Sequence, residues 1–123
     1  MLDGRDRQAR RLGRGIRSLD AKELHRLRIC IKKLRYASEF FEELWAKAAR
    51  ENYVGALKRL QDELGEVQDA ESATRLIGDI GEKQGYGGRQ AREWAKALRK
   101  RARRRTMRYW SEFRDAPRFW QLP

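Results

Sequence analysis

Four basic side chains in one segment have the spacing of a single helix face. The segment Leu24–Tyr36 reads LHRLRICIKKLRY. At about 100° per residue, four of its basic positions fall within roughly 80° of one another, in a stripe about 15 Å long. They are His25, Arg28, Lys32 and Arg35. Guanidinium, ammonium and protonated imidazole groups all donate hydrogen bonds to phosphate oxygens. The stripe therefore predicts a site for a phosphate-rich anion.

Apolar residues border this stripe on both sides. They are Leu24, Leu27 and Ile31 on one side and Ile29, Tyr36 and Phe40 on the other. This placement predicts a groove between packed elements, where water screens the charges weakly and an anion is needed to offset them. The alternative is a stripe neutralised by carboxylates. Those nearest in sequence are Glu39, Glu42 and Glu43.

The net charge of +12 is concentrated in two segments. Residues 1–17 carry +4 and residues 89–108 carry +9, whereas the remainder carries −1. Such concentration indicates a polyanionic partner, which is a nucleic acid, an acidic membrane surface or a chain of phosphates. The alternative is a basic protein whose charge serves only solubility. Within the second segment, Arg101, Arg105 and Arg108 share a helix face and are predicted to face the same groove as the stripe.

The composition argues against several other kinds of site. One cysteine (Cys30) and one histidine allow neither an internal disulfide nor the roughly four ligands of a structural zinc site. These counts leave open a catalytic triad with His25 as its base, but no nucleophile elbow accompanies His25. We expect no metal, no cofactor and no catalytic residue. An acidic segment offers one further alternative, metal-dependent phosphate chemistry, although its spacing also suits salt bridges. It contains Asp62, Glu63, Glu66 and Asp69. No apolar run approaches the roughly 20 residues of a membrane span, so we expect a cytoplasmic protein without membrane contact.

The hydrophobic pattern predicts an all-α fold, an antiparallel four-helix bundle. Residues 1–19 are expected to form a basic N-terminal arm or lead-in helix, and residues 20–123 the bundle. Asp20 and Glu23 have the spacing of a capping box, so the first helix should begin at Ala21. Further helices are expected from Asn52, with Gly65 as a weak point, from a cap at Asp69, and over residues 89–115. Trp94 and the other tryptophans and tyrosines have core spacing and are expected to pack inside the bundle. Gly81, Gly85, Gly87 and Gly88 mark a loop before the last helix, and Phe119–Trp120 should fold back onto the body.

Two motifs resemble the CHAD family, the conserved histidine α-helical domain. The segment Leu24–Tyr36 is similar to the family pattern L-H-x-x-R-I-x-x-K/R-K/R-L-R-Y. The segment Leu57–Ala70, LKRLQDELGEVQDA, is similar to L-K-x-L-Q-x-x-L-G-x-x-N-D, with Gln68 in place of the usual Asn. The closing Pro117–Trp120 (PRFW) is similar to a common family ending, so the resemblance spans about residues 21–120.

The resemblance implies a helical domain that binds inorganic polyphosphate through a basic channel without catalysis. Carried over by motif, the binding positions of the two helices are His25, Arg28, Lys32, Lys33, Arg35 and Lys58. Gln61 and Asp69 also match, and their expected roles are an interhelical hydrogen bond and a helix cap. Family members often occur on polyphosphate granules, so the same location is implied here. A general nucleic-acid-binding helical protein is the alternative.

A complete CHAD domain resembles two such bundles related by an approximate twofold axis, with the channel between them. This sequence has one copy of the motifs and resembles the C-terminal half. It is either a fragment or a half-length form. We therefore expect two chains to pair as a homodimer, each giving one wall of the channel.

Overall fold

Four α-helices and two short 3₁₀ turns make up the described part of the chain. The computed structural model describes residues 1–41, 44–84 and 89–121, with the side chains of residues 80–84 excepted. The helices are α1 (Leu2–Leu12), α2 (Ala21–Phe40), α3 (Lys47–Gln84) and α4 (Arg89–Asp115), and the turns are η1 (Ile16–Ser18) and η3 (Phe119–Gln121). No strand occurs in these ranges. The predicted all-α helical bundle is confirmed.

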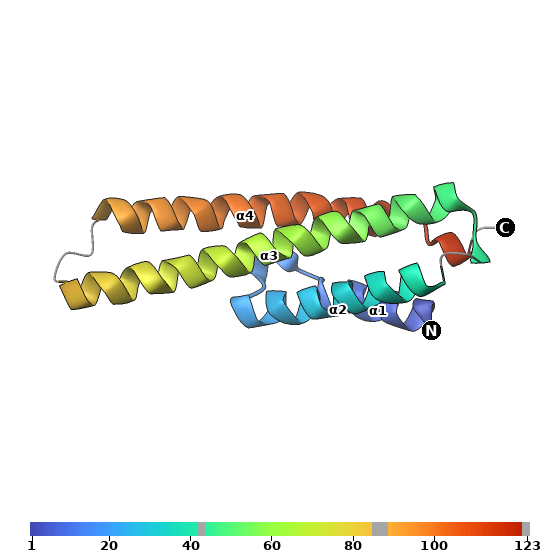
Figure 1. Ribbon diagram of the computed structural model, residues 1–123, viewed down its shortest axis with the longest axis horizontal. Helices are drawn as coiled ribbons and strands as arrows, with labels where there is room; N and C mark the ends of the chain where they lie inside the picture. The colour runs from blue at the N-terminus through green and yellow to red at the C-terminus, as the bar shows by residue number, and fades with distance from the viewer. Residues whose placement is uncertain (42–43, 85–88, 122–123) are drawn as a thin grey trace.

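Helices α3 and α4 form a long hairpin, and α1 and α2 pack against one half of it (Figure 1). Helix α3 has 38 residues and α2 has 20, so their lengths are about 57 Å and 30 Å. The hairpin therefore extends well beyond the shorter helices. Both ends of the chain lie at the end of the hairpin that these helices cover.

Helix α2 begins where the sequence predicts it. The Asp20 carboxylate accepts from the Glu23 backbone N–H at 2.8 Å, and the Glu23 side chain accepts from the Asp20 N–H at 3.2 Å. This capping box satisfies two amides of the first turn that have no partner inside the helix. The buried seam follows the predicted spacing. It consists of Leu24, Leu27, Ile31 and Leu34.

The second and third predicted helices are one continuous helix, so the separate helix expected from a cap at Asp69 is wrong. The buried positions Leu60, Leu64 and Val67 continue in three- and four-residue steps to Ala70. Burial of this face outweighs the roughly 1 kcal/mol that a glycine costs within a helix. Asp69 is exposed in mid-helix. Of the predicted loop glycines, Gly81 lies within α3 instead, and Gly85, Gly87 and Gly88 lie outside the described residues.

The N-terminal segment is a packed helix and not a mobile arm. In α1, Leu2 and Ala9 are buried in the same core as α2 and α3. At the end of α1 the indole of Trp110 packs against Gly13, which leaves no room for a side chain there. Of the two expected forms of this segment, the structure therefore shows the lead-in helix. The domain boundary expected between residues 19 and 20 stays a prediction.

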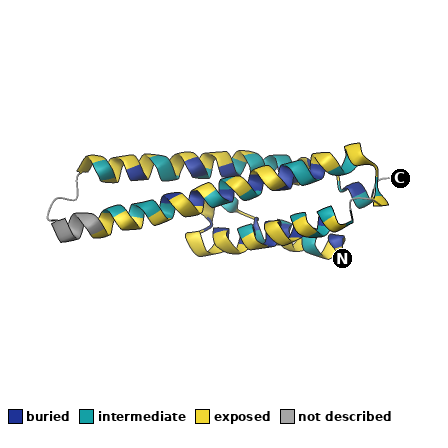
Figure 2. Cartoon of the chain, in the orientation of Figure 1, coloured by how far each residue is buried: buried dark blue, intermediate teal, exposed yellow. Residues whose placement is uncertain are grey.

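Buried residues concentrate where the four helices meet (Figure 2). Two apolar residues lie on the part of the hairpin that extends past the N-terminus of α2, where α1 and α2 do not cover it (Figure 1). Leu76 on α3 is 60% exposed and Trp94 on α4 is 58% exposed. The expectation that Trp94 packs in the core is therefore wrong, because α4 begins on the part of the hairpin that extends beyond α1 and α2 (Figure 1). Trp110, nearer the covered end, is buried as expected.

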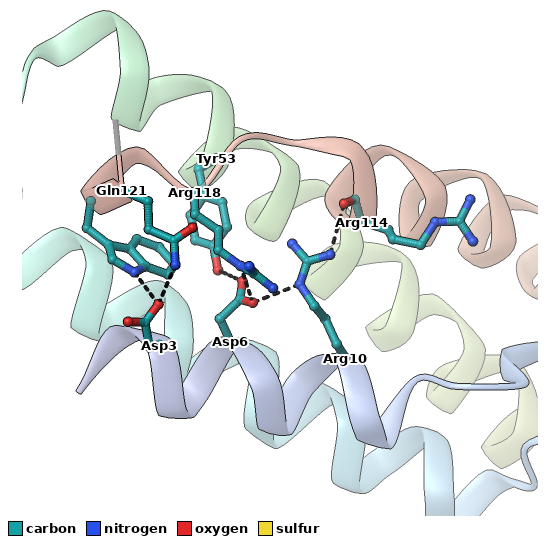
Figure 3. Close-up of polar contacts among 8 residues, drawn as sticks. Asp3, Asp6, Arg10, Tyr53, Arg114, Arg118 and Gln121 are labelled. Atoms are coloured by element: carbon teal, nitrogen blue, oxygen red, sulfur yellow. Dashed lines mark hydrogen bonds and ion pairs between the residues drawn. The ribbon is translucent and has the colours of Figure 1, made fainter. Parts of the chain in front are cut away.

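The Asp6 carboxylate, fully buried, joins three parts of the chain (Figure 3). Its oxygens accept from the Tyr53 hydroxyl of α3 at 2.6 Å, from Arg10 Nε of α1 at 2.7 Å and from Arg118 Nε at 2.8 Å. Arg10 also donates to the backbone carbonyl of Arg114 at 2.9 Å. Burial, and then the hydrogen bond to Asp6, raise the pKa of Tyr53, so this hydroxyl remains a donor.

A second carboxylate holds the C-terminal turn. Asp3 accepts from the indole N–H of Trp120 at 2.7 Å and from the Gln121 amide at 2.9 Å. The Trp120 hydrogen bond is the main reason that the pKa of Asp3 lies below its usual range. Phe119 is buried against Tyr53, with ring centroids 5.6 Å apart. The predicted folding back of Phe119–Trp120 is therefore observed.

Replacing the buried carboxylate should destabilise the whole fold. We expect Asp6→Asn to lower the free energy of unfolding by about 2–4 kcal/mol, since Arg10 and Arg118 then lose their shared counter-charge. Their side chains are 22% and 34% exposed, which lets water offset part of that loss. Urea denaturation followed by circular dichroism measures the change. The control Asp62→Asn alters an exposed residue, so its free energy of unfolding should stay within about 0.5 kcal/mol of the wild-type value. Equal losses in both variants would contradict this account.

Candidate anion-binding groove

Arg28 crosses from α2 onto the surface of α3. Its Nη1 donates to Gln68 Oε1 at 3.2 Å, and its Nε is buried without a hydrogen-bond partner in the described structure. The guanidinium lies over Gly65, where an added Cβ would sit 3.6 Å from Nε. A neutral amide holds this cation in place without neutralising it.

Arg35 lies further along the same face. Its Nε is also buried and has no hydrogen-bond partner among the described residues. The Arg35 guanidinium lies 4.9 Å and the Lys32 ammonium 5.8 Å from the centre of the Tyr36 ring. The antiparallel contacts of α2 with α3 place Arg35 level with Gln61, whose Oε1 is buried without a partner. The hydrogen bond expected through this oxygen is therefore not formed.

The acidic residues of the described structure do not neutralise the stripe. Glu39 pairs instead with Lys58 of α3, at 3.9 Å. In the described ranges no carboxylate lies within 4.0 Å of the stripe's basic nitrogens. Glu42 and Glu43 lie outside these ranges. Like charges held together without counter-charges make the groove strongly electropositive and favour an anion.

Beside the N-terminus of α2, the groove opens into a hollow of 500 Å³. His25 lines it together with Lys22, Arg26 and Arg75, and the opposite wall includes Gln68 and Glu71. Glu71 already pairs with Arg99 at 3.7 Å and Arg103 at 3.6 Å, on α4. The hollow therefore continues the basic surface beyond Arg28.

The outer edge of the stripe is open rather than packed. Ile29 is 40%, Tyr36 50% and Phe40 82% exposed. The expectation of packed elements on both sides of the stripe is therefore wrong for this chain by itself. Helix α3 covers one side, and no described element covers the other. An uncovered apolar edge beside a basic groove is a surface suited to a further protein wall.

The arginines of α4 lie in different surroundings from the stripe. Arg101 and Arg105 line a hollow between α3 and α4 that also contains Glu63, and no residue of α2 lines it. Arg105 pairs with Glu63 at 3.9 Å, and Arg108 with Glu112 at 3.7 Å. The structure does not bring these three to the α2–α3 groove, so their part in binding stays a prediction.

Lys33 is exposed on the side of α2 that faces α1. Burial raises the pKa of the neighbouring Cys30 thiol, and the charges of Arg5, Lys33 and Arg11 oppose that rise. Lys33 therefore lies near α1 rather than beside Arg28 and Arg35. The described structure brings five of the predicted binding residues to the α2–α3 groove. They are His25, Arg28, Lys32, Arg35 and Lys58.

Gln68 and Gly65 are the two site residues that sequence reasoning missed. Gln68 was noted only for replacing an Asn, and Gly65 only as a weak point in a helix. Gly65 lies four residues and Gln68 seven residues after Gln61, so all three share the face of α3 that meets α2. This spacing is the sequence signal that could have identified them. In the described part of the chain, no three His, Cys, Asp or Glu side chains are grouped to hold a metal ion. No described helix has the length and apolarity needed to span a membrane.

Comparison with known families agrees with these features. The CHAD domain model matches residues 1–78, which include α1, α2 and most of α3. The chain belongs to the CHAD domain family. The match includes the N-terminal helix, which the motifs alone did not cover, and ends before α4. Neither the comparison with curated proteins nor that with solved structures gave a match.

The geometry at Gly65 predicts that a methyl group is accepted there. We expect Gly65→Ala to raise the free energy of unfolding by about 0.5–1 kcal/mol, because alanine loses less backbone entropy in a helix. The added Cβ meets Arg28 at ordinary contact distance, so the Arg28–Gln68 hydrogen bond should remain. Thermal denaturation measures the stability. Gly65→Leu is the contrasting variant, since its branched side chain occupies the place of the guanidinium. A loss of stability in Gly65→Ala would contradict the described packing.

Proposed function

We propose that the protein binds inorganic polyphosphate, without catalysis, along the α2–α3 groove. The observation that carries this proposal is the row formed by Arg28, Lys32 and Arg35, whose charges no described carboxylate neutralises. The family to which the chain belongs is associated with polyphosphate binding. A cytoplasmic location on polyphosphate granules follows as part of the same proposal.

The row suits a chain of phosphates better than a single one. Its cations occupy successive turns of α2, about 5 Å apart, so neighbouring phosphates of one polymer can each contact a different side chain. The Nε atoms of Arg28 and Arg35 have no hydrogen-bond partner among the described residues, so part of the hydrogen-bonding capacity of these side chains is unused. Polymer binding also releases condensed cations, so affinity should fall steeply with salt, by about one unit of logarithmic slope for each neutralised phosphate.

Competition between two polyanions tests the proposal. At about 150 mM salt we expect long-chain polyphosphate to displace duplex DNA from the protein. The combined variant Arg28→Ala, Lys32→Ala and Arg35→Ala should lose about 1–2 kcal/mol of polyphosphate binding for each residue removed. Fluorescence anisotropy with labelled polyphosphate measures the competition with DNA and the affinity of the variant.

The control removes two basic residues of α4, Arg101→Ala and Arg105→Ala, and its effect is compared with that of the α2 variant per residue removed. Equal effects of the two sets of substitutions would contradict a site on α2. Equal binding of both polymers, unchanged in the α2 variant, would support the alternative of general nucleic-acid binding through the charge of α4.

We propose in addition that two chains pair across the open edge of the groove. Ile29, Tyr36 and Phe40 are exposed there, and Leu44 is exposed just beyond the end of α2. A second copy placed over them would bury this apolar edge and give the groove its second wall. The chain would then contain one half of a twofold channel, in agreement with its single set of motifs.

Substitution of Phe40 tests this pairing. We expect Phe40→Ser to turn a dimer into a monomer in sedimentation velocity and to weaken polyphosphate binding, because the apolar contact and the second wall are lost. Leu76→Ser is the matched control, since Leu76 is comparably exposed but lies beyond α2 on the hairpin. A wild-type protein that stays monomeric at micromolar concentration and still binds polyphosphate tightly would exclude the pairing.

A further inference from the structure

A second basic groove lies between η1 and α4. Two adjoining hollows form it, and they share Ile16, Arg17, Arg104 and Met107. Six cations line the two hollows, and no carboxylate does. The six are Arg17, Lys100, Arg103, Arg104, Arg108 and Arg114. The hollow between α3 and α4 differs in having carboxylates in its lining, because Glu63, Glu66 and Asp69 accompany the arginines there.

Local contacts fix the shape of this η1–α4 groove. Gly15 has a φ of 64°, a conformation that favours glycine, and the Ser18 N–H donates to the Gly15 carbonyl at 2.8 Å. Arg103 Nη1 donates to the Leu19 carbonyl at 2.8 Å, which ties the chain after η1 to α4. The groove is therefore formed before any ligand arrives.

Three of its cations are free to meet a ligand. Within the described ranges Arg17, Lys100 and Arg104 have neither a hydrogen bond nor an ion pair through their side chains, and all three are exposed. The floor between them is apolar. It is formed by Ile16, Leu24 and Met107, with the Thr106 side chain turned to the Ala102 carbonyl. The groove thus combines an apolar floor with a rim of unpaired positive charge.

We propose that the η1–α4 groove docks an acidic peptide segment of a partner protein. An aliphatic side chain of the segment would lie on the Ile16–Met107 floor, and flanking carboxylates would meet Arg17 and Arg104. Buried aliphatic contact and charge-assisted hydrogen bonds both contribute to such a complex. This inference does not depend on the proposed polyphosphate site.

Other polyanions fit the groove less well. Inorganic polyphosphate has no apolar surface, so covering this floor would bring it no gain. Nucleic acid bases need exposed aromatic faces for stacking. The tryptophan that lines the groove, Trp110, is buried and packs against Gly13.

The dimensions suit a short segment. From Lys100 to Arg114 the α4 wall is roughly 21 Å long. An extended peptide of about six residues has this length. An eight-residue probe in which glutamate and leucine alternate therefore covers the groove, and a probe with serine at each leucine position has the same charge.

Fluorescence anisotropy with the two labelled probes tests the proposal. We expect the leucine probe to bind at least about tenfold more tightly than the serine probe, because only leucine uses the floor. The variant Arg17→Ser and Arg104→Ser should bind the leucine probe about tenfold less tightly. The control Arg28→Ser and Arg35→Ser should leave its affinity unchanged. Circular dichroism checks that each variant keeps its helical content.

Equal affinity of the two probes for the wild-type protein would overturn the proposal, and this comparison needs no variant. Equal losses in the two variants would also overturn it, since they would show general attraction to positive charge. Labelled polyphosphate should bind the Arg17 and Arg104 variant normally. Loss of polyphosphate binding there, with the peptide probes unaffected, would assign the η1–α4 groove to polyphosphate instead.

Discussion

The fully buried carboxylate of Asp6 is the interaction on which the rest of the structure depends. Removing a carboxylate from water is unfavourable unless charged or polar donors surround it. Here the donors come from Arg10 on α1, Tyr53 on α3 and Arg118 after α4. The basic N-terminal segment, which has the composition of a mobile arm, is thereby held as a packed helix. Because α1 and α3 are tied together, α2 is held between them and its basic stripe follows the surface of α3.

The two charged regions of the molecule differ in how their charges are matched. Around Asp6, the guanidinium groups of Arg10 and Arg118 both pair with the carboxylate, and these contacts stabilise the fold. Along the α2–α3 groove, Arg28 has a neutral amide and Arg35 an aromatic ring as neighbours, so both keep their full charge. Such a site is electrostatically incomplete until an anion binds. This contrast supports the proposal that the first region stabilises the fold and the second binds an anion.

Sequence patterns were most informative where a local rule and burial agree. The capping box at Asp20 and Glu23 and the seam of α2 were predicted correctly, since both depend on residues within a few turns. The separate helix expected from Asp69 was wrong because a continuous buried face overrode the local signals at Gly65 and Asp69. The stripe was found from helical angles alone. The contacts of Arg28 with Gly65 and Gln68 could not be predicted, because they depend on the register between α2 and α3, which no local sequence pattern contains. The surroundings of Arg101 and Arg105 likewise depend on which helix lies beside α4.

Titration of ¹⁵N-labelled protein with polyphosphate, observed at the arginine Nε–Hε resonances, tests the binding site most directly. The Nε atoms of Arg28 and Arg35 are buried and have no described hydrogen-bond partner. The account predicts that these two resonances shift first and saturate together, while those of Arg101 and Arg105 shift later or not at all. Early shifts at Arg101 and Arg105, with Arg28 and Arg35 unchanged, would contradict a polyphosphate site in the α2–α3 groove.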